Sequence, residues 1–182
     1  MLLANKTAII YGGAGDVGGA VARAFAREGA RVFLAGRTAA TLEAAAAAIR
    51  AAGGLAETTQ VDAFSLQSVE QSLDDVIARA GRIDISFNAV GHDDVQGQSM
   101  LEMSQALFAT PITNAMITYF NTSTASARRM VDQGSGVILG ISANAARMAY
   151  PNIGGFGAAC AAIEALCRQL AIEVGPQGVR VV

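Results

Sequence analysis

Short apolar runs alternate with longer alanine-rich runs along the whole chain. Several of the short runs are nearly continuous stretches of Val, Ile, Leu and Phe. This pattern is typical of strands in a parallel sheet whose two faces are both covered. Six strands are predicted on this basis: Thr7–Tyr11, Arg31–Ala35, Glu57–Asp62, Ile83–Asn88, Val137–Ser142 and Val179–Val182.

The longer runs show the apolar spacing of helices. Val17, Val21, Ala24 and Phe25 follow that spacing, and Gly29 is placed to end the helix that contains them. Four more helices are predicted, over Thr41–Ala52, Ser68–Ala80, Ser104–Val131 and Gly154–Val174.

Two local signals concern the starts of these helices. Ser68 and Gln71 have the spacing of a capping box, which predicts that the third helix begins at Ser68. Pro111 indicates either a break in the fourth helix or its true start, because proline removes a backbone hydrogen bond.

Strand and helix alternate through the chain with short glycine-containing connections. The alternation predicts an α/β fold with a doubly wound parallel sheet of the Rossmann type and right-handed crossovers. A length of 182 residues suits one domain, so residues 1–182 are expected to form a single domain. The chain stops directly after the sixth predicted strand, which makes the sheet look truncated there.

Composition narrows the possible partners. Apolar residues make up 52% of the chain and charged residues 15%, against about 25% in ordinary soluble domains. The net charge is −2 and basic residues do not cluster, which argues against nucleic acid as a partner. No apolar stretch approaches the roughly 18 residues of a membrane span, and the first residues do not resemble a signal peptide. We therefore expect no membrane partner and a cytoplasmic location.

The cysteines and the histidine exclude a metal or disulfide framework. Cys160 and Cys167 lie seven residues apart on one predicted helix, about 10 Å along its axis, which is too far for a disulfide. His92 is the only histidine, and no second pair of Cys or His supplies zinc-ligand spacing. Free thiols in a reducing compartment and no bound metal are predicted.

A glycine-rich segment connects the first predicted strand to the first helix. Gly13, Gly15 and Gly18 satisfy one dinucleotide-binding pattern, and Gly12, Gly15 and Gly18 satisfy a related one. Glycines permit a tight turn and let backbone N–H groups approach a pyrophosphate at the helix N-terminus. This strand–loop–helix context predicts a nucleotide-binding loop. The alternative is a turn that only packs helix on strand.

The second predicted strand ends in Gly36 and Arg37 rather than in an acidic residue. An acid at this point would bind the ribose 2′-hydroxyl of NAD, whereas a guanidinium can bind a 2′-phosphate. NADP(H) is therefore predicted over NAD(H). The alternative is that Arg37 is an ordinary solvated residue at a strand end.

With these motifs in place, the chain resembles the short-chain dehydrogenase/reductase superfamily along its whole length. The opening strand–helix–strand unit is similar, with Tyr11 where Thr is usual and Asp16 at a common Gly position. Asp62 and Ala63 resemble the acidic turn that contacts adenine. The resemblance implies a cofactor site formed by Gly12, Gly13, Gly15, Asp16, Val17, Gly18, Arg37, Asp62, Ala63, Asn88, Ala89, Val90 and Gly91.

The catalytic pattern of that family is missing. Family members carry a Ser on the fifth strand and a Tyr-x-x-x-Lys motif on the next helix, where the Tyr transfers a proton and the Lys lowers its pKa. Here the Ser position is Ala143, the Tyr position is Phe156 and the Lys position is Cys160. Phe156 has no proton to give, and Cys160 supplies no fixed positive charge. Cys160 is expected to act as a small buried apolar residue.

Neighbouring polar groups are candidates to replace the missing ones. Ser142 is one residue off, and on a regular strand it would face the other side of the sheet. Tyr150 lies in the loop before the last helix. Asn114 falls within one residue of the family's helix Asn. His92, with two acidic neighbours, is expected in a solvated loop over the cofactor site.

The sequence thus predicts an NADP(H)-dependent oxidoreductase that acts on a small-molecule carbonyl or alcohol through an atypical active site. The alternative is a non-catalytic nucleotide-binding or interaction subunit on the same fold. The resemblance also implies a homodimer or homotetramer formed through the two long helices. Relatives continue past the sixth strand, so the substrate pocket is expected to be incomplete in this chain.

Overall fold

The computed structural model describes residues 1–182 and contains one six-stranded sheet. The strands are β1 (Thr7–Tyr11), β2 (Arg31–Gly36), β3 (Leu55–Gln60), β4 (Ile85–Asn88), β5 (Gly136–Leu139) and β6 (Val179–Val181). They pair in parallel in the order β3-β2-β1-β4-β5-β6. The predicted doubly wound α/β fold is confirmed.

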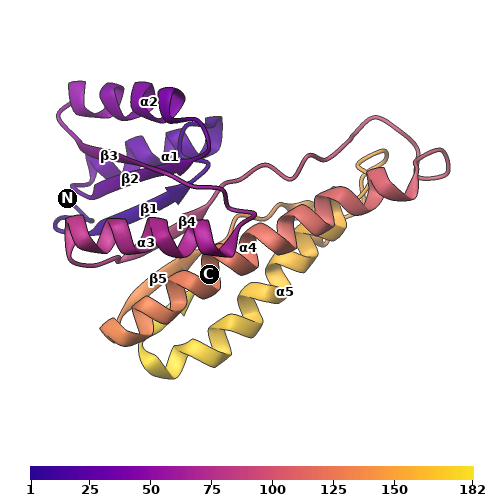
Figure 1. The fold of residues 1–182 in the computed structure, drawn as a ribbon. Coiled ribbons are helices and arrows are strands. Elements are labelled where there is room, and N and C mark those ends of the chain that lie inside the picture. Colours follow the sequence, from indigo (N-terminus) through magenta and orange to yellow (C-terminus); the bar gives the residue numbers. More distant parts are fainter.

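Five α-helices connect the strands (Figure 1). They are α1 (Asp16–Arg27), α2 (Ala39–Ala51), α3 (Leu66–Ala80), α4 (Gln105–Gln133) and α5 (Phe156–Val174). Short 3₁₀ turns, η1 (Asn144–Ala146) and η2 (Gly175–Gln177), precede and follow α5. None of the helices is long and apolar enough to span a membrane.

Alternate residues of each strand belong to two different cores. Ile9 and Phe33 pack in the core that α3 and α4 cover, whereas Ile10 and Val32 pack in the core that α1 and α2 cover. Both faces of the central strands are therefore buried, which explains the continuous apolar runs in the sequence. The helices after β1 and β4 lie on opposite faces, so a crevice opens between the carboxyl ends of these neighbouring strands.

The predicted start of the third helix and the predicted role of Pro111 were wrong, whereas the predicted start of the fourth helix at Ser104 is confirmed. The helix α3 begins after Ser65, whose side chain accepts a hydrogen bond from the backbone N–H of Ser68, so Ser65 is the cap. Pro111 lies inside α4 and neither breaks nor starts it. The side chain of Ser104 caps α4 seven residues before Pro111, and the helix continues through the proline at the cost of one backbone hydrogen bond.

The fifth strand ends at Leu139 rather than at Ser142. Beyond it, the backbone N–H of Ile141 donates to the hydroxyl of Tyr119 on α4, at 3.1 Å, instead of to a neighbouring strand. A side chain therefore ends the strand earlier than the apolar pattern suggests. The strand β3 also lies earlier than predicted: it begins at Leu55, which pairs with Arg31 of β2, and ends at Gln60.

Candidate functional site

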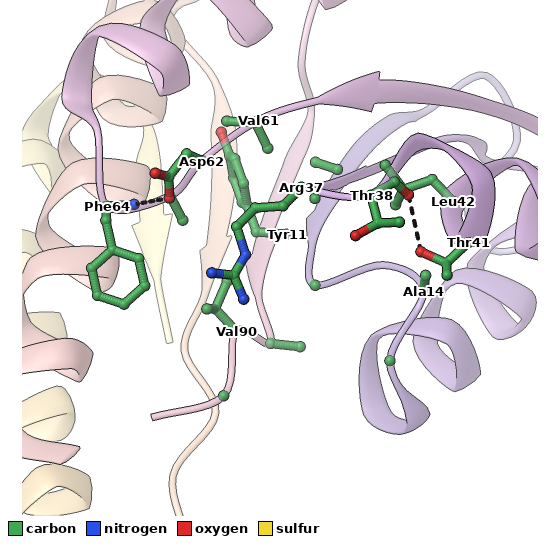
Figure 2. A pocket seen from close by; sticks show the side chains of 17 residues that line it. Tyr11, Ala14, Arg37, Thr38, Thr41, Leu42, Val61, Asp62, Phe64 and Val90 are labelled. Carbon is green, nitrogen blue, oxygen red and sulfur yellow. Dashed lines mark hydrogen bonds between the residues drawn. The ribbon is translucent and has the colours of Figure 1, made fainter. Parts of the chain in front are cut away.

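A cleft of about 270 Å³ opens where β1, β2 and β4 end (Figure 2). Four segments line it: the loop after β1, the turn between β2 and α2, the turn after β3 and the turn after β4. The lining residues are Tyr11, Gly12, Ala14, Gly15, Ala35, Gly36, Arg37, Thr38, Thr41, Leu42, Val61, Asp62, Ala63, Phe64, Ala89, Val90 and Gly91. This position is the crevice in which open α/β sheets bind ligands.

Three glycines of the loop are required by close backbone packing. Gly12 has a φ of +71°, and a Cβ atom there would lie 2.6 Å from the carbonyl oxygen of Ala89. A Cβ atom on Gly18 would collide with the carbonyl oxygen of Gly12, and one on Gly13 would lie 2.9 Å from the Cα atom of Leu34. Gly13 and Gly18 are themselves buried behind the cleft.

Gly15 differs from these three glycines. Its φ of −77° is open to any residue, and a Cβ atom there would meet only the carbonyl oxygen of Gly12, at 3.3 Å. It is the N-cap of α1 and provides no capping side chain, so the first backbone N–H groups of α1 stay open. The loop therefore presents bare backbone donors at a helix N-terminus, which is suited to binding an anion.

Arg37 lies on the turn between β2 and α2 and points into the cleft (Figure 2). It is the only cationic side chain in the lining, and its guanidinium forms no ion pair, whereas nine other basic side chains do. The amide of Gln60 on β3 donates to the carbonyl oxygen of Arg37, at 2.9 Å, and so fixes the turn. An exposed, unpaired guanidinium is left free to bind an anionic group.

Asp62 follows β3, the strand next to β2, and lies beside Arg37 in the cleft (Figure 2). Its Oδ1 atom accepts a hydrogen bond from the backbone N–H of Phe64, at 3.1 Å, and its own N–H donates to Ser68. These bonds hold the short turn before α3 in shape. The second carboxylate oxygen accepts no hydrogen bond from the protein and remains available as an acceptor.

Asn88, the last residue of β4, lies behind the cleft and does not line it. Its side-chain oxygen accepts a bond from the N–H of Val90 at 2.9 Å, and its amide donates to the hydroxyl of Thr122 on α4 at 3.1 Å. The side chain is buried, so these bonds replace the water it loses. Asn88 thereby fixes the turn Ala89–Gly91 between β4 and α4.

The structure brings together eight of the residues predicted for the cofactor site: Gly12, Gly15, Arg37, Asp62, Ala63, Ala89, Val90 and Gly91. Gly13, Gly18 and Asn88 lie behind them, and Asp16 and Val17 are exposed at the start of α1. The sequence interpretation omitted Thr38 and Phe64, which directly follow the predicted residues Arg37 and Ala63, and it omitted Thr41, which lies in α2. The hydroxyl of Thr41 donates to the carbonyl oxygen of Thr38, at 2.9 Å, within the first turn of α2.

Comparison with known proteins agrees with this arrangement. A family model for short chain dehydrogenase matches residues 6–182. The chain belongs to the short-chain dehydrogenase/reductase family. This family consists of oxidoreductases that use NAD or NADP.

Individual relatives show the extent of the similarity. An uncharacterized oxidoreductase of Bacillus subtilis is 35% identical over 179 residues, covering 98% of this chain and 65% of the relative. L-rhamnose 1-dehydrogenase (NAD(P)(+)) of Azotobacter vinelandii is 34% identical, covering 99% of this chain and 72% of the relative. A solved structure of NAD⁺-bound xylitol dehydrogenase has a TM-score of 0.93 at 28% identity, covering 100% of this chain and 69% of that one. The chain thus spans about two thirds of the length of the relatives it matches.

The three positions of the family's catalytic pattern hold no Ser hydroxyl, Tyr phenol or Lys ammonium group. Ala143 precedes η1, Phe156 is the first residue of α5, and Cys160 lies one turn further along α5. Cys160 is 2% exposed and behaves as the small buried residue that was predicted. Both cysteines are free, so the prediction of no disulfide is confirmed.

The hydroxyl of Ser142 is directed to α5. It donates to a carboxylate oxygen of Glu164 at 3.2 Å and lies 3.4 Å from the carbonyl oxygen of Cys160. Arg147 also bonds that carboxylate, with N–O distances of 3.2 and 3.0 Å, and holds the pKa of Glu164 below its usual value. Ser142 therefore belongs to a polar cluster on α5.

Tyr150 lies in the exposed loop between η1 and α5. Its hydroxyl accepts a bond from the amide of Asn144 at 2.7 Å and contacts the sulfur of Met148 at 3.8 Å. Neither Tyr150 nor Ser142 lines the cofactor cleft.

His92 is not fully solvated, contrary to the prediction. Its ring is half-buried against Tyr119, with ring centres 5.9 Å apart, and its Nε2 atom is buried without a hydrogen-bond partner. Burial lowers the pKa of His92, although Asp94 and Asp93 act in the opposite direction. The amide of Asn114 donates to the carbonyl oxygen of His92 and to Asp93, at 3.3 and 3.1 Å, and ties this loop to α4.

Tyr119 on α4 packs against the helix that carries Phe156 and Cys160, and the sequence interpretation did not single it out. It is 2% exposed and packs with Ala159 and Ile163 of α5. Its hydroxyl lies 3.0 Å from the carbonyl oxygen of Asn88 and 3.1 Å from both the carbonyl oxygen and the N–H of Ile141. Burial raises its pKa, so the phenol stays protonated and joins the ends of β4 and β5.

The contrast between Gly15 and Gly18 predicts unequal effects of the same substitution. Gly18→Ala should destabilise the chain by about 3 kcal/mol or more, because the new methyl group overlaps the backbone of Gly12. Gly15→Ala should change the free energy of unfolding by less than about 1 kcal/mol. Urea denaturation of both variants measures the difference, and similar losses would contradict this account of the loop.

Proposed function

We propose that this chain binds NADP(H) in the cleft around the glycine loop and acts as an oxidoreductase on a small-molecule carbonyl or alcohol. The observation that carries the proposal is the unpaired guanidinium of Arg37, which lines the same cleft as Gly12 and Gly15. Family membership supports the redox chemistry, and the relatives include enzymes described with NAD⁺ and with NAD(P)⁺.

The chain's own residues fit a dinucleotide. The open N–H groups at the start of α1 face the position of the pyrophosphate, since no side chain of Gly15 covers them. Arg37 and the hydroxyls of Thr38 and Thr41 are placed for a 2′-phosphate beyond β2. The free oxygen of Asp62 is an acceptor for the adenine amino group, and the apolar side chain of Val61 lies beside it in the lining.

Bound NADPH supplies the hydride, and the protein has to place it against the substrate. Asn88 and the turn Ala89–Gly91 set the floor of the site at the end of β4. Ala143 and Phe156 carry no proton that could be transferred there, and the thiol of Cys160 is only 2% exposed. Ser142, Tyr150 and solvent remain the sources of a proton, and the first two are engaged with Glu164 and Asn144. We therefore propose slow proton transfer as the distinguishing property of this chain.

Two further features belong to the proposal. Free thiols on α5 suit a reducing compartment, and we assign the chain to the cytoplasm on that ground.

We also propose that α4 and α5 form an interface with a second copy. Ile117 and Phe120 lie three residues apart on one face of α4 and are 40% and 52% exposed.

Replacing Arg37 tests the cofactor assignment. Arg37→Ala should weaken NADPH binding by about 1.5–3 kcal/mol, because the charged hydrogen bonds to the 2′-phosphate are lost. NADH binding should change little. Titration calorimetry with both cofactors measures this, and Arg23→Ala serves as a control because Arg23 is also unpaired but lies outside the cleft. Equal affinities for both cofactors before and after the change would contradict the assignment.

Restoring the family's catalytic pair tests the mechanism. A positioned general acid contributes roughly 10²–10⁴ in rate, so the unaltered chain should reduce simple ketones slowly or not at all. Phe156→Tyr with Cys160→Lys should raise the rate, whereas Phe156→Tyr alone should do little because an unassisted phenol has a pKa near 10. NADPH consumption by the four proteins measures this.

The outcomes of that assay separate the two functional hypotheses. Fast turnover by the unaltered chain would show that another residue has taken the role of the acid. An inert double variant that binds NADPH normally would favour a non-catalytic nucleotide-binding subunit. Because Cys160 is buried, the folding of the lysine variant has to be checked by circular dichroism in the same experiment.

Introducing a negative charge on α4 tests the proposed interface. Phe120→Glu should dissociate the oligomer, because a carboxylate would be buried against apolar side chains of the second copy. Light scattering over a range of concentrations gives the mass. Leu55→Glu is the matched control, since Leu55 is 62% exposed on β3, at the opposite edge of the sheet. A monomer at high concentration before any substitution would contradict the interface.

A further inference from the structure

Asp16 introduces a negative charge at the mouth of the glycine loop. It is the first residue of α1 and the only acidic residue in the first turn. Its side chain is exposed and forms neither a hydrogen bond nor an ion pair. The residue before it, Gly15, contributes no side chain that could shield this charge.

The carboxylate of Asp16 lies at the same helix end that offers its N–H groups to an anion. The N-terminus of α1 carries a partial positive charge, which stabilises a nearby anion. In the free protein the carboxylate of Asp16 is that anion. A diphosphate arriving at Gly15 meets a helix end whose charge is already partly balanced, and it also meets direct repulsion from a carboxylate within one helical turn.

We propose that Asp16 sets the cofactor affinity by opposing the diphosphate, so that tight binding requires the compensating contact with Arg37. The inference rests on the proposed function, because it assumes a dinucleotide in this cleft. The repulsion acts on a group that NADP and NAD share, so it lowers both affinities by a similar factor. Only the cofactor with a 2′-phosphate recovers the loss, through the unpaired guanidinium of Arg37 on the far side of the loop.

The charge-neutral variant Asp16→Asn separates this role from a structural one. If Asp16 only stabilises α1, the variant melts slightly lower and binds nucleotides as before. If Asp16 opposes the diphosphate, the variant still melts slightly lower without ligand, but it binds NADPH, NADH and ADP-ribose about fivefold to tenfold more tightly. In that case the melting temperature of the free protein falls while its affinity for the nucleotides rises.

The matched control is Asp132→Asn. Asp132 is also exposed and unpaired but lies near the end of α4, so its removal changes the net charge equally without touching the loop. Calorimetric titrations of the three proteins with each ligand, at low salt and at 1 M salt, measure the effect. The gain in affinity of the Asp16→Asn variant should be smaller at 1 M salt, because charges are then screened within about 3 Å.

Each outcome decides the proposal. Tighter binding of all three ligands by Asp16→Asn alone supports it. Unchanged or weaker binding by Asp16→Asn, while the unaltered chain binds NADPH, overturns this inference and leaves the proposed function intact. The same gain in Asp132→Asn overturns it as well, because the effect would then be one of net charge. Failure of all three proteins to bind any ligand overturns both this inference and the proposed function.

Discussion

The candidate site depends on the contact between two backbone segments, the glycine loop after β1 and the turn after β4. Gly12 lies so close to the carbonyl of Ala89, and Gly18 so close to Gly12, that a single methyl group at either position would displace the chain. This contact holds the start of α1 against the crevice between β1 and β4. The start of α1 and the turn Ala89–Gly91 take their relative positions from it.

The fold could be predicted because its signals are local and repeated. Continuous apolar runs identified six strands, and glycines after helices identified the connections. The strand ends were less accurate, because contacts from distant residues determine them. The strand β5 stops at Leu139, and shortly after it the backbone N–H of Ile141 donates to the hydroxyl of Tyr119, a residue far earlier in the chain. No pattern within the strand itself contains that information.

The residues of the candidate site that belong to motifs could be predicted, and those outside motifs could not. Residues in motifs, such as Gly12, Gly15 and Arg37, lie together in the cleft. Thr38 and Phe64 line it because they directly follow motif residues, and Thr41 lines it from the start of α2. His92 was misplaced because a histidine between polar neighbours gives no sign of the aromatic ring it packs against. The sequence also did not show that Gly18 is required by close packing and Gly15 is not, because this difference depends on the surrounding atoms.

The hydroxyl of Tyr119 has a consequence for motion in this molecule. It connects α4 to the ends of two strands at once, through Asn88 and Ile141. A helix that slides by one residue moves about 1.5 Å along its axis, which is more than a hydrogen bond of 3.0 Å tolerates. The helix α4 is therefore locked in register with the sheet. Closure around a ligand by a sliding of α4 is therefore opposed by the hydrogen bonds of a single buried side chain.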